Sequence, residues 1–141
     1  MGKRREGREA AIQFLFQHDV HAGKKPELEG DFWELRPSTA NVREFSEALI
    51  KGVLANQEAI DERIRKYTAN YELNRIAVVD RNVLRVAIYE MLFCNDVPPV
   101  VSINEAIEIA KKFGAEESGR FVNGILDRVK LDLSRPARTT S

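Results

Sequence analysis

The chain has 141 residues, about the length of one domain, and its 43% hydrophobic and 31% charged residues are typical of a globular protein with a single core. Its 22 basic and 22 acidic residues cancel, so the net charge argues against a protein that coats nucleic acid indiscriminately. No apolar run approaches the ~20 residues that span a bilayer, and no signal-peptide core follows the basic N-terminus. We therefore expect no membrane association and a cytoplasmic location.

The sequence lacks the residues expected for an intrachain disulfide, a metal site or an enzyme active site. Cys94 is the only cysteine, so no disulfide forms within the chain, and its apolar surroundings predict a buried thiol in a reducing compartment. His18 and His21 lack the further ligands needed for the roughly four of a zinc site. The glycine and serine patterns of nucleotide-binding and hydrolase sites do not occur. We expect no metal, no cofactor and no catalytic activity.

Two helices are predicted in the first third of the chain. After a basic start, apolar residues recur at three- and four-residue steps over residues 11–22, and Gly23 ends this helix. A short helix is predicted over residues 28–35, with Pro37 as its stop.

The next predicted helix is long and bent. Asn41 and Glu44 have the spacing of an N-terminal cap, and apolar residues continue the helical period as far as Tyr67, with a bend near Asn56. Residues 72–75 then predict a hinge between two helical halves.

The helix after the hinge is predicted to have one apolar side. The apolar side consists of Ile76, Val79, Val83, Leu84, Ala87 and Met91. The opposite side is predicted to carry Arg81, Asn82 and Arg85. Asp80 and Glu90 also fall on the apolar side, where a charge requires a partner. For Asp80 the residues allow an internal ion pair or a first-turn carboxylate favoured by the helix dipole, and for Glu90 we expect a structural role.

Two more helices are predicted towards the C-terminus. Ser102 and Glu105 match a capping box, and Gly114 is predicted to end that helix in a left-handed conformation. A glycine inside a helix costs about 1 kcal/mol, so Gly124 predicts a close helix crossing in the last helix. The buried side of the last helix is predicted to carry Val122, Ile125, Leu126 and Val129.

The chain shows neither alternating strand patterns nor a fixed-period repeat, and we therefore predict an all-α fold. Two small helical bundles, residues 1–71 and 74–133, are expected to pack into one domain over residues 1–133. Residues 134–141 are expected to form a flexible tail.

Basic residues crowd the N-terminus, so local positive potential survives in a neutral chain. This basic head, as it is called below, consists of Lys3, Arg4, Arg5 and Arg8. On a helical wheel, one strip beside the apolar stripe joins Arg5, Arg8, Ile12 and Phe16, with Gln13 nearby. Cations with a flat ring suit single-stranded RNA, since the cations hold phosphates while the ring stacks on a base. The alternative is a solvated N-terminal tail with Phe16 in the core, and the residues alone do not separate the two.

A second candidate for RNA contact lies at the start of the last helix, at Ser118, Arg120 and Phe121. Phenylalanine is usually buried, so the residues alone favour a core position for Phe121.

Four sequence blocks resemble the signature blocks of the NusB family of bacterial transcription antitermination factors. They are VVDRNVLRVAIYE (Val78 to Glu90), DVP (Asp96 to Pro98), INEAIEIAKKFG (Ile103 to Gly114) and FVNGILD (Phe121 to Asp127). The resemblance covers most of residues 4–129 and is weak over residues 23–70.

The resemblance implies that the basic head binds the single-stranded boxA element of nascent transcripts, and that Phe121 of the intact FVNG motif contacts this RNA. It also implies a partner, the ribosomal small-subunit protein NusE, at a surface that includes Asp80. The expected role is non-enzymatic: assembly of an antitermination complex on RNA polymerase, including on ribosomal RNA transcripts.

Two other functions remain open from the sequence. A similar domain precedes the catalytic part of some ribosomal RNA cytosine methyltransferases, which would make the chain an RNA-binding accessory module, although its end at Ser141 leaves no space for that part. Alternatively, the chain is a helical homodimer that masks its basic strip.

Overall fold

In the computed structural model, the described part of the chain comprises residues 2–21, 28–68 and 72–134 and contains helices but no strand, which confirms the predicted all-α fold. The elements are α1 (Lys3–Val20), α2 (Leu28–Leu35), α3 (Ala40–Ala55), α4 (Gln57–Lys66), the short 3-10 helix η1 (Leu73–Arg75), α5 (Val78–Phe93), α6 (Pro99–Phe113) and α7 (Ser118–Ser134). The predicted stop at Gly23 and residues 135–141 of the predicted tail lie outside the described residues, whereas Ser134, its first residue, is the last residue of α7. No described helix is long and apolar enough to cross a membrane.

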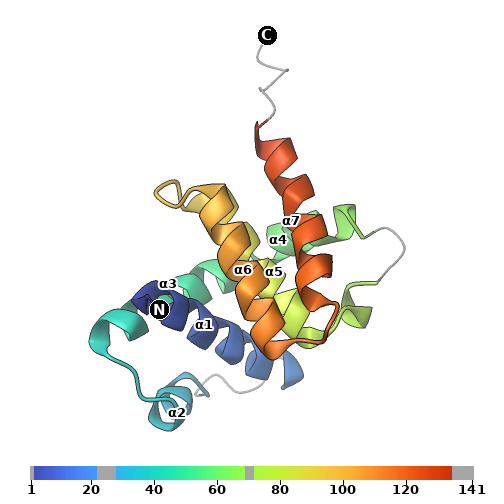
Figure 1. Ribbon diagram of the computed structural model, residues 1–141. Coiled ribbons are helices and arrows are strands. Elements are labelled where there is room, and N and C mark those ends of the chain that lie inside the picture. The colour runs from blue at the N-terminus through green and yellow to red at the C-terminus, as the bar shows by residue number, and fades with distance from the viewer. Residues whose placement is uncertain (1, 22–27, 69–71, 135–141) are drawn as a thin grey trace.

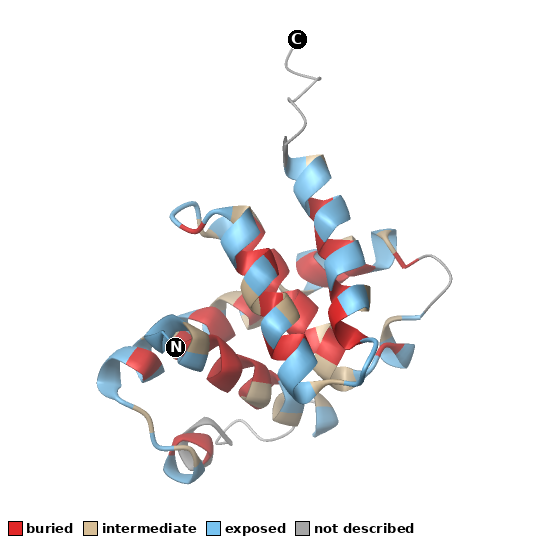
Figure 2. Cartoon of the chain, viewed as in Figure 1, coloured by how far each residue is buried: buried red, intermediate tan, exposed pale blue. Residues whose placement is uncertain are grey.

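Helix α5 is the centre of the fold, because α1, α3, α4, α6 and α7 all pack against it. Helices α6 and α7 run antiparallel beside each other, and α2 lies at the edge of the molecule (Figure 1). Figure 2 shows exposed positions along the outer sides of α6 and α7 and buried positions where they face the other helices. This arrangement leaves the start of α1 and the start of α7 at the surface.

Asn82 and Arg85, which were predicted opposite the apolar side of α5, are both buried. The helical period marks a solvent face only where one side of a helix is free, and the polar side of α5 is covered by α1 and α4. Arg81 is half-buried on the same side. The polar side of this helix is therefore an interior surface.

Two predicted helix starts lie too late in the sequence. Helix α3 is capped by Thr39, whose Oγ1 accepts a hydrogen bond of 3.3 Å from the Val42 backbone N–H, and not by Asn41 and Glu44. Helix α6 begins at Pro99, because proline fits the first helical position, where its missing N–H leaves no hydrogen bond unmade. Ser102 and Glu105 thus lie inside α6, and the predicted capping box does not form.

The other predicted helix ends and bends are confirmed in part. The predicted bend near Asn56 is confirmed as a break between α3 and α4, where Asn56 Nδ2 donates to the Gly52 carbonyl at 2.8 Å. Helix α6 does end at Gly114, but this glycine has φ −97°, so the predicted left-handed conformation is wrong. Cys94 is half-buried and not fully buried as expected.

Gly124 is not a packing glycine. A Cβ at Gly124 would meet nothing within 4 Å, so the predicted close helix crossing there is wrong. The close approach lies at Gly52 in α3, where a Cβ would collide with the Tyr89 side chain of α5. Glycine at residue 52 lets α3 and α5 approach each other, and we have no packing reason for Gly124.

Candidate nucleic-acid interface

The basic head forms the first turns of α1, with Lys3 and Arg4 exposed. The Arg4 Cζ atom lies 5.0 Å from the centroid of the Phe45 ring of α3, a cation–π geometry. A Cβ at Gly7 would come within 2.5 Å of the same ring, so glycine at residue 7 lets Phe45 lie directly against α1. The packing of Phe45 therefore fixes the first turns of α1, which carry the two exposed cations.

Arg5 is half-buried and forms a bidentate ion pair with Glu105 of α6. Its Nε donates to Oε1 at 2.5 Å, and its Nη2 donates to Oε2 at 2.8 Å. The hydrogen bond from Arg5 is the main cause that lowers the pKa of Glu105, and the same bond raises the pKa of Arg5. The pair joins the start of α1 to α6.

Arg8 is buried, with 4% of its surface exposed, and is not part of the exposed basic surface that the wheel predicted. Its Nε donates to both carboxylate oxygens of Glu90 in α5, at 3.1 and 3.0 Å, and Ser102 Oγ donates to Glu90 Oε1 at 2.8 Å. The expected structural role of Glu90 fits these contacts. The helical wheel placed Arg8 on the correct side of α1. Helices α5 and α6 pack over that side and bury the residue.

Gln13 and Phe16 lie away from the head, in an apolar groove of about 500 Å³ between α1, α2, α5 and α6. Gln13 Oε1 accepts a hydrogen bond of 2.6 Å from Arg36 Nε. Phe16 and Phe113 are each 37% exposed, so Phe16 is neither in the core nor beside the basic residues. This groove, called the aromatic groove below, is lined by Ile12, Gln13, Phe16, Gln17, Phe32, Leu35, Arg36, Val79 and Phe113.

The three candidates at the start of α7 have different surroundings. Ser118 is buried, and its Oγ accepts a hydrogen bond of 2.9 Å from the Ala115 backbone N–H. Arg120 is exposed and pairs with Glu117 at 3.3 Å. Phe121 is half-buried, with part of its ring packed against the core. The structure thus leaves Arg120 and part of Phe121 accessible to a ligand.

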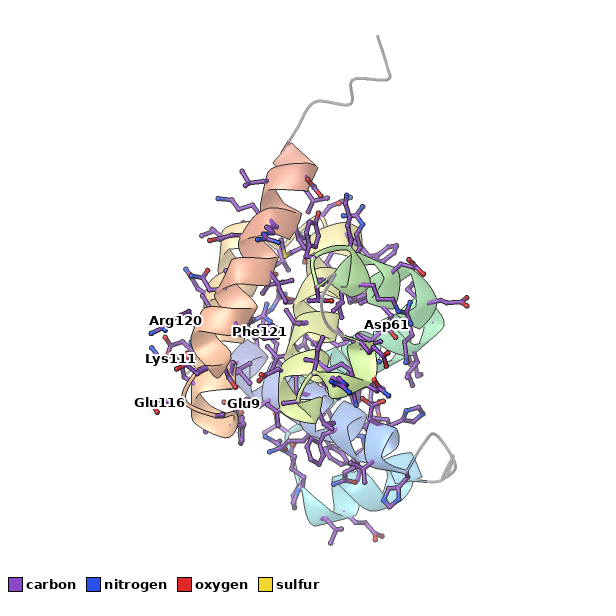
Figure 3. All side chains as sticks on the ribbon, turned by 90° about the vertical axis from the view of Figure 1, so that its right-hand side faces the viewer. Glu9, Asp61, Lys111, Glu116, Arg120 and Phe121 are labelled. Carbon is purple, nitrogen blue, oxygen red and sulfur yellow. The ribbon has the colours of Figure 1, made fainter. Side chains whose placement is uncertain are left out.

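Lys111 of α6 joins this surface, although it was not among the residues predicted to contact RNA. Its stem lies on the α7 backbone, because a Cβ at Gly119 would be only 2.9 Å from Lys111 Cγ. Its Nζ lies 3.6 Å from Glu108 Oε2, a loose contact between two exposed side chains. In Figure 3, Lys111, Arg120 and Phe121 lie together towards the start of α7, and Asp61 lies on the other side of the view. Gly119 was the sequence signal that would have found this contact.

Asp80 lies in the first turn of α5 and is 8% exposed, yet its Oδ1 has no hydrogen-bond partner in the part of the chain that the structure describes. None of the ion pairs among the described residues includes Asp80, so the internal ion pair considered from the sequence is not found there. The position near the positive end of the α5 dipole favours the carboxylate. Its neighbour Val79 lines the aromatic groove, whereas Asp80 itself is not one of the lining residues.

A buried polar cluster on the other side of α5 was missed by the sequence analysis. Asp19 Oδ2 accepts hydrogen bonds from Arg81 Nε (3.1 Å), Asn82 Nδ2 (3.0 Å) and Arg85 Nη1 (2.8 Å). Arg85 also donates two bonds to Asp61 of α4, at 2.8 and 3.0 Å. Burial opposes ionisation of Asp19, but the charges of Arg85 and Arg81 and the Asn82 hydrogen bond outweigh it and lower the pKa.

This cluster ties the end of α1 and α4 to α5, and its charges satisfy one another. We therefore interpret this cluster as a structural contact between the helices and not as a ligand site. Among the described residues, no group of three or more His, Cys, Asp or Glu side chains is arranged to hold a metal ion.

Comparison with known proteins places these features in a family. The model of the NusB family matches residues 5–130. The transcription antitermination protein NusB of Methylacidiphilum infernorum is 45% identical over 138 residues, covering 97% of this chain and 96% of the relative. That of Geobacter sulfurreducens is 48% identical over 134 residues, covering 94% and 97%.

Solved structures indicate the same family. NusB from T. maritima is similar with a TM-score of 0.82 and 44% identity, covering 92% of this chain and 91% of that one. A complex of the antitermination factors NusB and NusE with double-stranded RNA contains a chain with a TM-score of 0.82 and 25% identity, covering 92% and 97%. The match spans the basic head from Arg5, the helix that carries Asp80 and the FVNG motif, and the chain therefore belongs to the NusB family of transcription antitermination proteins.

Proposed function

We propose that this protein binds boxA-like single-stranded RNA and, together with NusE, promotes assembly of an antitermination complex on RNA polymerase, including on ribosomal RNA transcripts. The observation that carries the proposal is the similarity, over nearly the whole chain, to a NusB that has been solved in complex with NusE and RNA. The exposed cations and the exposed aromatic groove give this chain a surface suited to each partner.

The RNA surface in this proposal runs from the start of α1 across α6 to the start of α7. Lys3 and Arg4 supply phosphate contacts, which give affinity but carry no base specificity. Phe121 supplies the stacking ring, with Arg120 beside it, and a stacked base contributes about 1–3 kcal/mol. Helix α6 connects the two ends, because Arg5 pairs with its Glu105 and its Lys111 lies on α7.

NusE is proposed to occupy the aromatic groove and to pair with Asp80, which follows the groove residue Val79 in α5. Exposed aromatic side chains in a groove are typical anchors of a protein interface, where they are buried against the partner. No described residue donates to Oδ1 of Asp80, and an arginine or lysine of the partner would supply a donor. Phe16 then belongs to the partner surface and not to the RNA surface.

Separate titrations of variants with NusE and with boxA RNA test this division. Asp80→Asn and Phe16→Ala should each weaken NusE binding about tenfold or more, since a desolvated charge contact or a buried aromatic anchor contributes upwards of ~1.4 kcal/mol. RNA binding should stay within twofold of wild type. Asp96→Asn and Val100→Ala are matched controls, because both residues are exposed outside the groove.

Equal losses on both ligands would contradict the separation of the two surfaces. A loss of thermal stability in Asp80→Asn, without any loss of NusE affinity, would make Asp80 a structural residue. Sedimentation of the free protein shows whether a second copy of the chain occupies the groove. Parallel titrations with single-stranded and with duplex boxA RNA show which form the protein binds.

A further inference from the structure

The basic head does not present all its charge to solvent, because two of its four cations are held by carboxylates of the same chain. Arg8 and Glu90 are both nearly inaccessible, and Glu90 is also bonded by Ser102, so this pair is closed to any ligand. Arg5 and Glu105 form the second pair, and their side chains are 26% and 21% exposed. The second pair therefore stands at the surface, in the same helix turns as Lys3 and Arg4.

We propose that Glu105 sets the RNA affinity of the basic head by competing with an RNA phosphate for the Arg5 guanidinium. The proposal rests on RNA binding by the head, as proposed above. A carboxylate and a phosphate are alternative acceptors for the same two parallel N–H donors of an arginine. In the free protein Glu105 occupies both donors, Nε and Nη2, so a phosphate must displace it to gain this contact.

The surroundings of the pair permit this exchange. The Arg5 and Glu105 side chains keep 26% and 21% of their surface exposed, so a phosphate can reach this guanidinium without opening a buried pair such as Arg8–Glu90. After displacement, Glu105 does not lose all compensation, since Arg8 Nη1 lies 3.9 Å from its Oε1. Arg8 can thus hold the released carboxylate while Arg5 turns to the phosphate.

Neutralising the competitor tests the proposal. Glu105→Gln keeps the size and the hydrogen-bonding oxygen of the side chain but removes its charge. Its affinity for single-stranded boxA RNA should rise several-fold over wild type. The log–log salt dependence should stay within about 0.7 of the wild-type slope, because both proteins make the same phosphate contact through Arg5 and only the competing carboxylate is gone.

Two comparisons separate the exchange from a general change in charge. In an Arg5→Gln background, Glu105→Gln should produce almost no gain, because the guanidinium at issue is missing. Glu108→Gln removes the same charge one turn along α6. Glu108 acts on Arg5 only through its charge and lies 3.6 Å from Lys111 of the proposed RNA surface, so the gain that it produces does not depend on Arg5. Its gain should be smaller than that of Glu105→Gln and should persist without Arg5.

Nuclear magnetic resonance of the wild-type protein provides a measurement that needs no substitution. Titration with boxA RNA should shift the Nε–Hε signal of Arg5 and leave that of Arg8 nearly unchanged. An unshifted Arg5 signal on saturation with RNA would overturn the proposal.

The variant results can also overturn it. If folded Glu105→Gln binds RNA no better than wild type, or more weakly, Glu105 does not compete and instead positions Arg5 or plays no part. A gain equal to that of Glu108→Gln and undiminished without Arg5 would reduce the effect to net charge. If wild-type protein fails to bind boxA RNA at all, the proposed function itself is refuted, which is a distinct result.

Discussion

The most consequential reassignment concerns Arg8, which the sequence placed among the RNA-binding cations and the structure places in a buried network. Arg8→Met tests this reassignment, because methionine keeps most of the apolar stem and removes the guanidinium. Among the described residues, the change leaves Glu90, which is 1% exposed, with the Ser102 hydroxyl as its remaining hydrogen-bond donor. A buried carboxylate without its cation is strongly destabilising.

The magnitude follows from that burial. Removing one partner of a buried ion pair costs about 3–5 kcal/mol, and domains of this size unfold with roughly 5–15 kcal/mol in total. We therefore expect Arg8→Met to lose about 3–5 kcal/mol and to melt on the order of 10 °C lower. Adding Glu90→Gln should restore part of the loss, because the second change removes the unpaired charge.

Urea unfolding followed by circular dichroism measures these free energies at fixed pH and salt. Arg65→Met is the matched control, since Arg65 and Glu62 form an exposed pair on α4 at 3.2 Å. An exposed pair of this spacing contributes only about 0.3–0.5 kcal/mol. The two arginine variants should thus differ roughly tenfold in their effect on stability.

A small effect would refute the reasoning. If Arg8→Met destabilises by less than about 1 kcal/mol, like an exposed pair, the guanidinium is not confined beside Glu90. If stability is retained and RNA binding is lost with a shallower salt dependence, Arg8 is a phosphate contact after all.

Three further predictions follow from the site. Replacing Lys3 and Arg4 by Gln should weaken RNA binding and flatten the log–log salt slope by about 0.7 per lost contact, and an unchanged slope in anisotropy titrations would exclude both residues from the phosphate contacts. Phe121→Ala should weaken RNA binding by about 1–3 kcal/mol while the variant remains folded, whereas a collapse of the melting transition with normal binding by the folded fraction would make Phe121 a core residue. The lowered pKa values of Glu105 and Asp19 mean that their carboxylates stabilise the fold at pH values above the ordinary range near 4, and this contribution is lost as the pH falls through the lower folded-state values. The stability difference between wild type and Glu105→Gln, measured by urea unfolding, should therefore shrink as the pH falls from about 6 to about 3, and a constant difference would count against the ionised pair.

The sequence was most informative where a helix has one free side. Apolar spacing located α7 and its buried residues correctly, and Phe121 could be placed at its start, because α7 packs through one stripe and exposes the other. The same reasoning failed for α5, whose polar side is covered. Arg85 pairs with Asp19, 66 residues away, and no local pattern indicates such a partner.

The candidate site shows the same limit. A helical wheel aligned Arg5, Arg8 and Phe16 on one strip, but exposure along that strip depends on the helices that cover it. Helices α5 and α6 bury Arg8, Glu105 holds Arg5, and the aromatic groove receives Phe16. The function came from a resemblance in four short blocks and not from periodicity, since the residues alone left RNA binding and a solvated tail equally open.

The measurement that tests the central claim most directly is the binding of labelled boxA RNA to this protein with and without NusE. The account predicts tighter binding of boxA than of a scrambled RNA of equal length, and tighter binding still when NusE is present. Because coupling between two ligands is reciprocal, the RNA should also strengthen NusE binding by the same factor. Equal affinity for both RNAs, unaffected by NusE, would contradict the account.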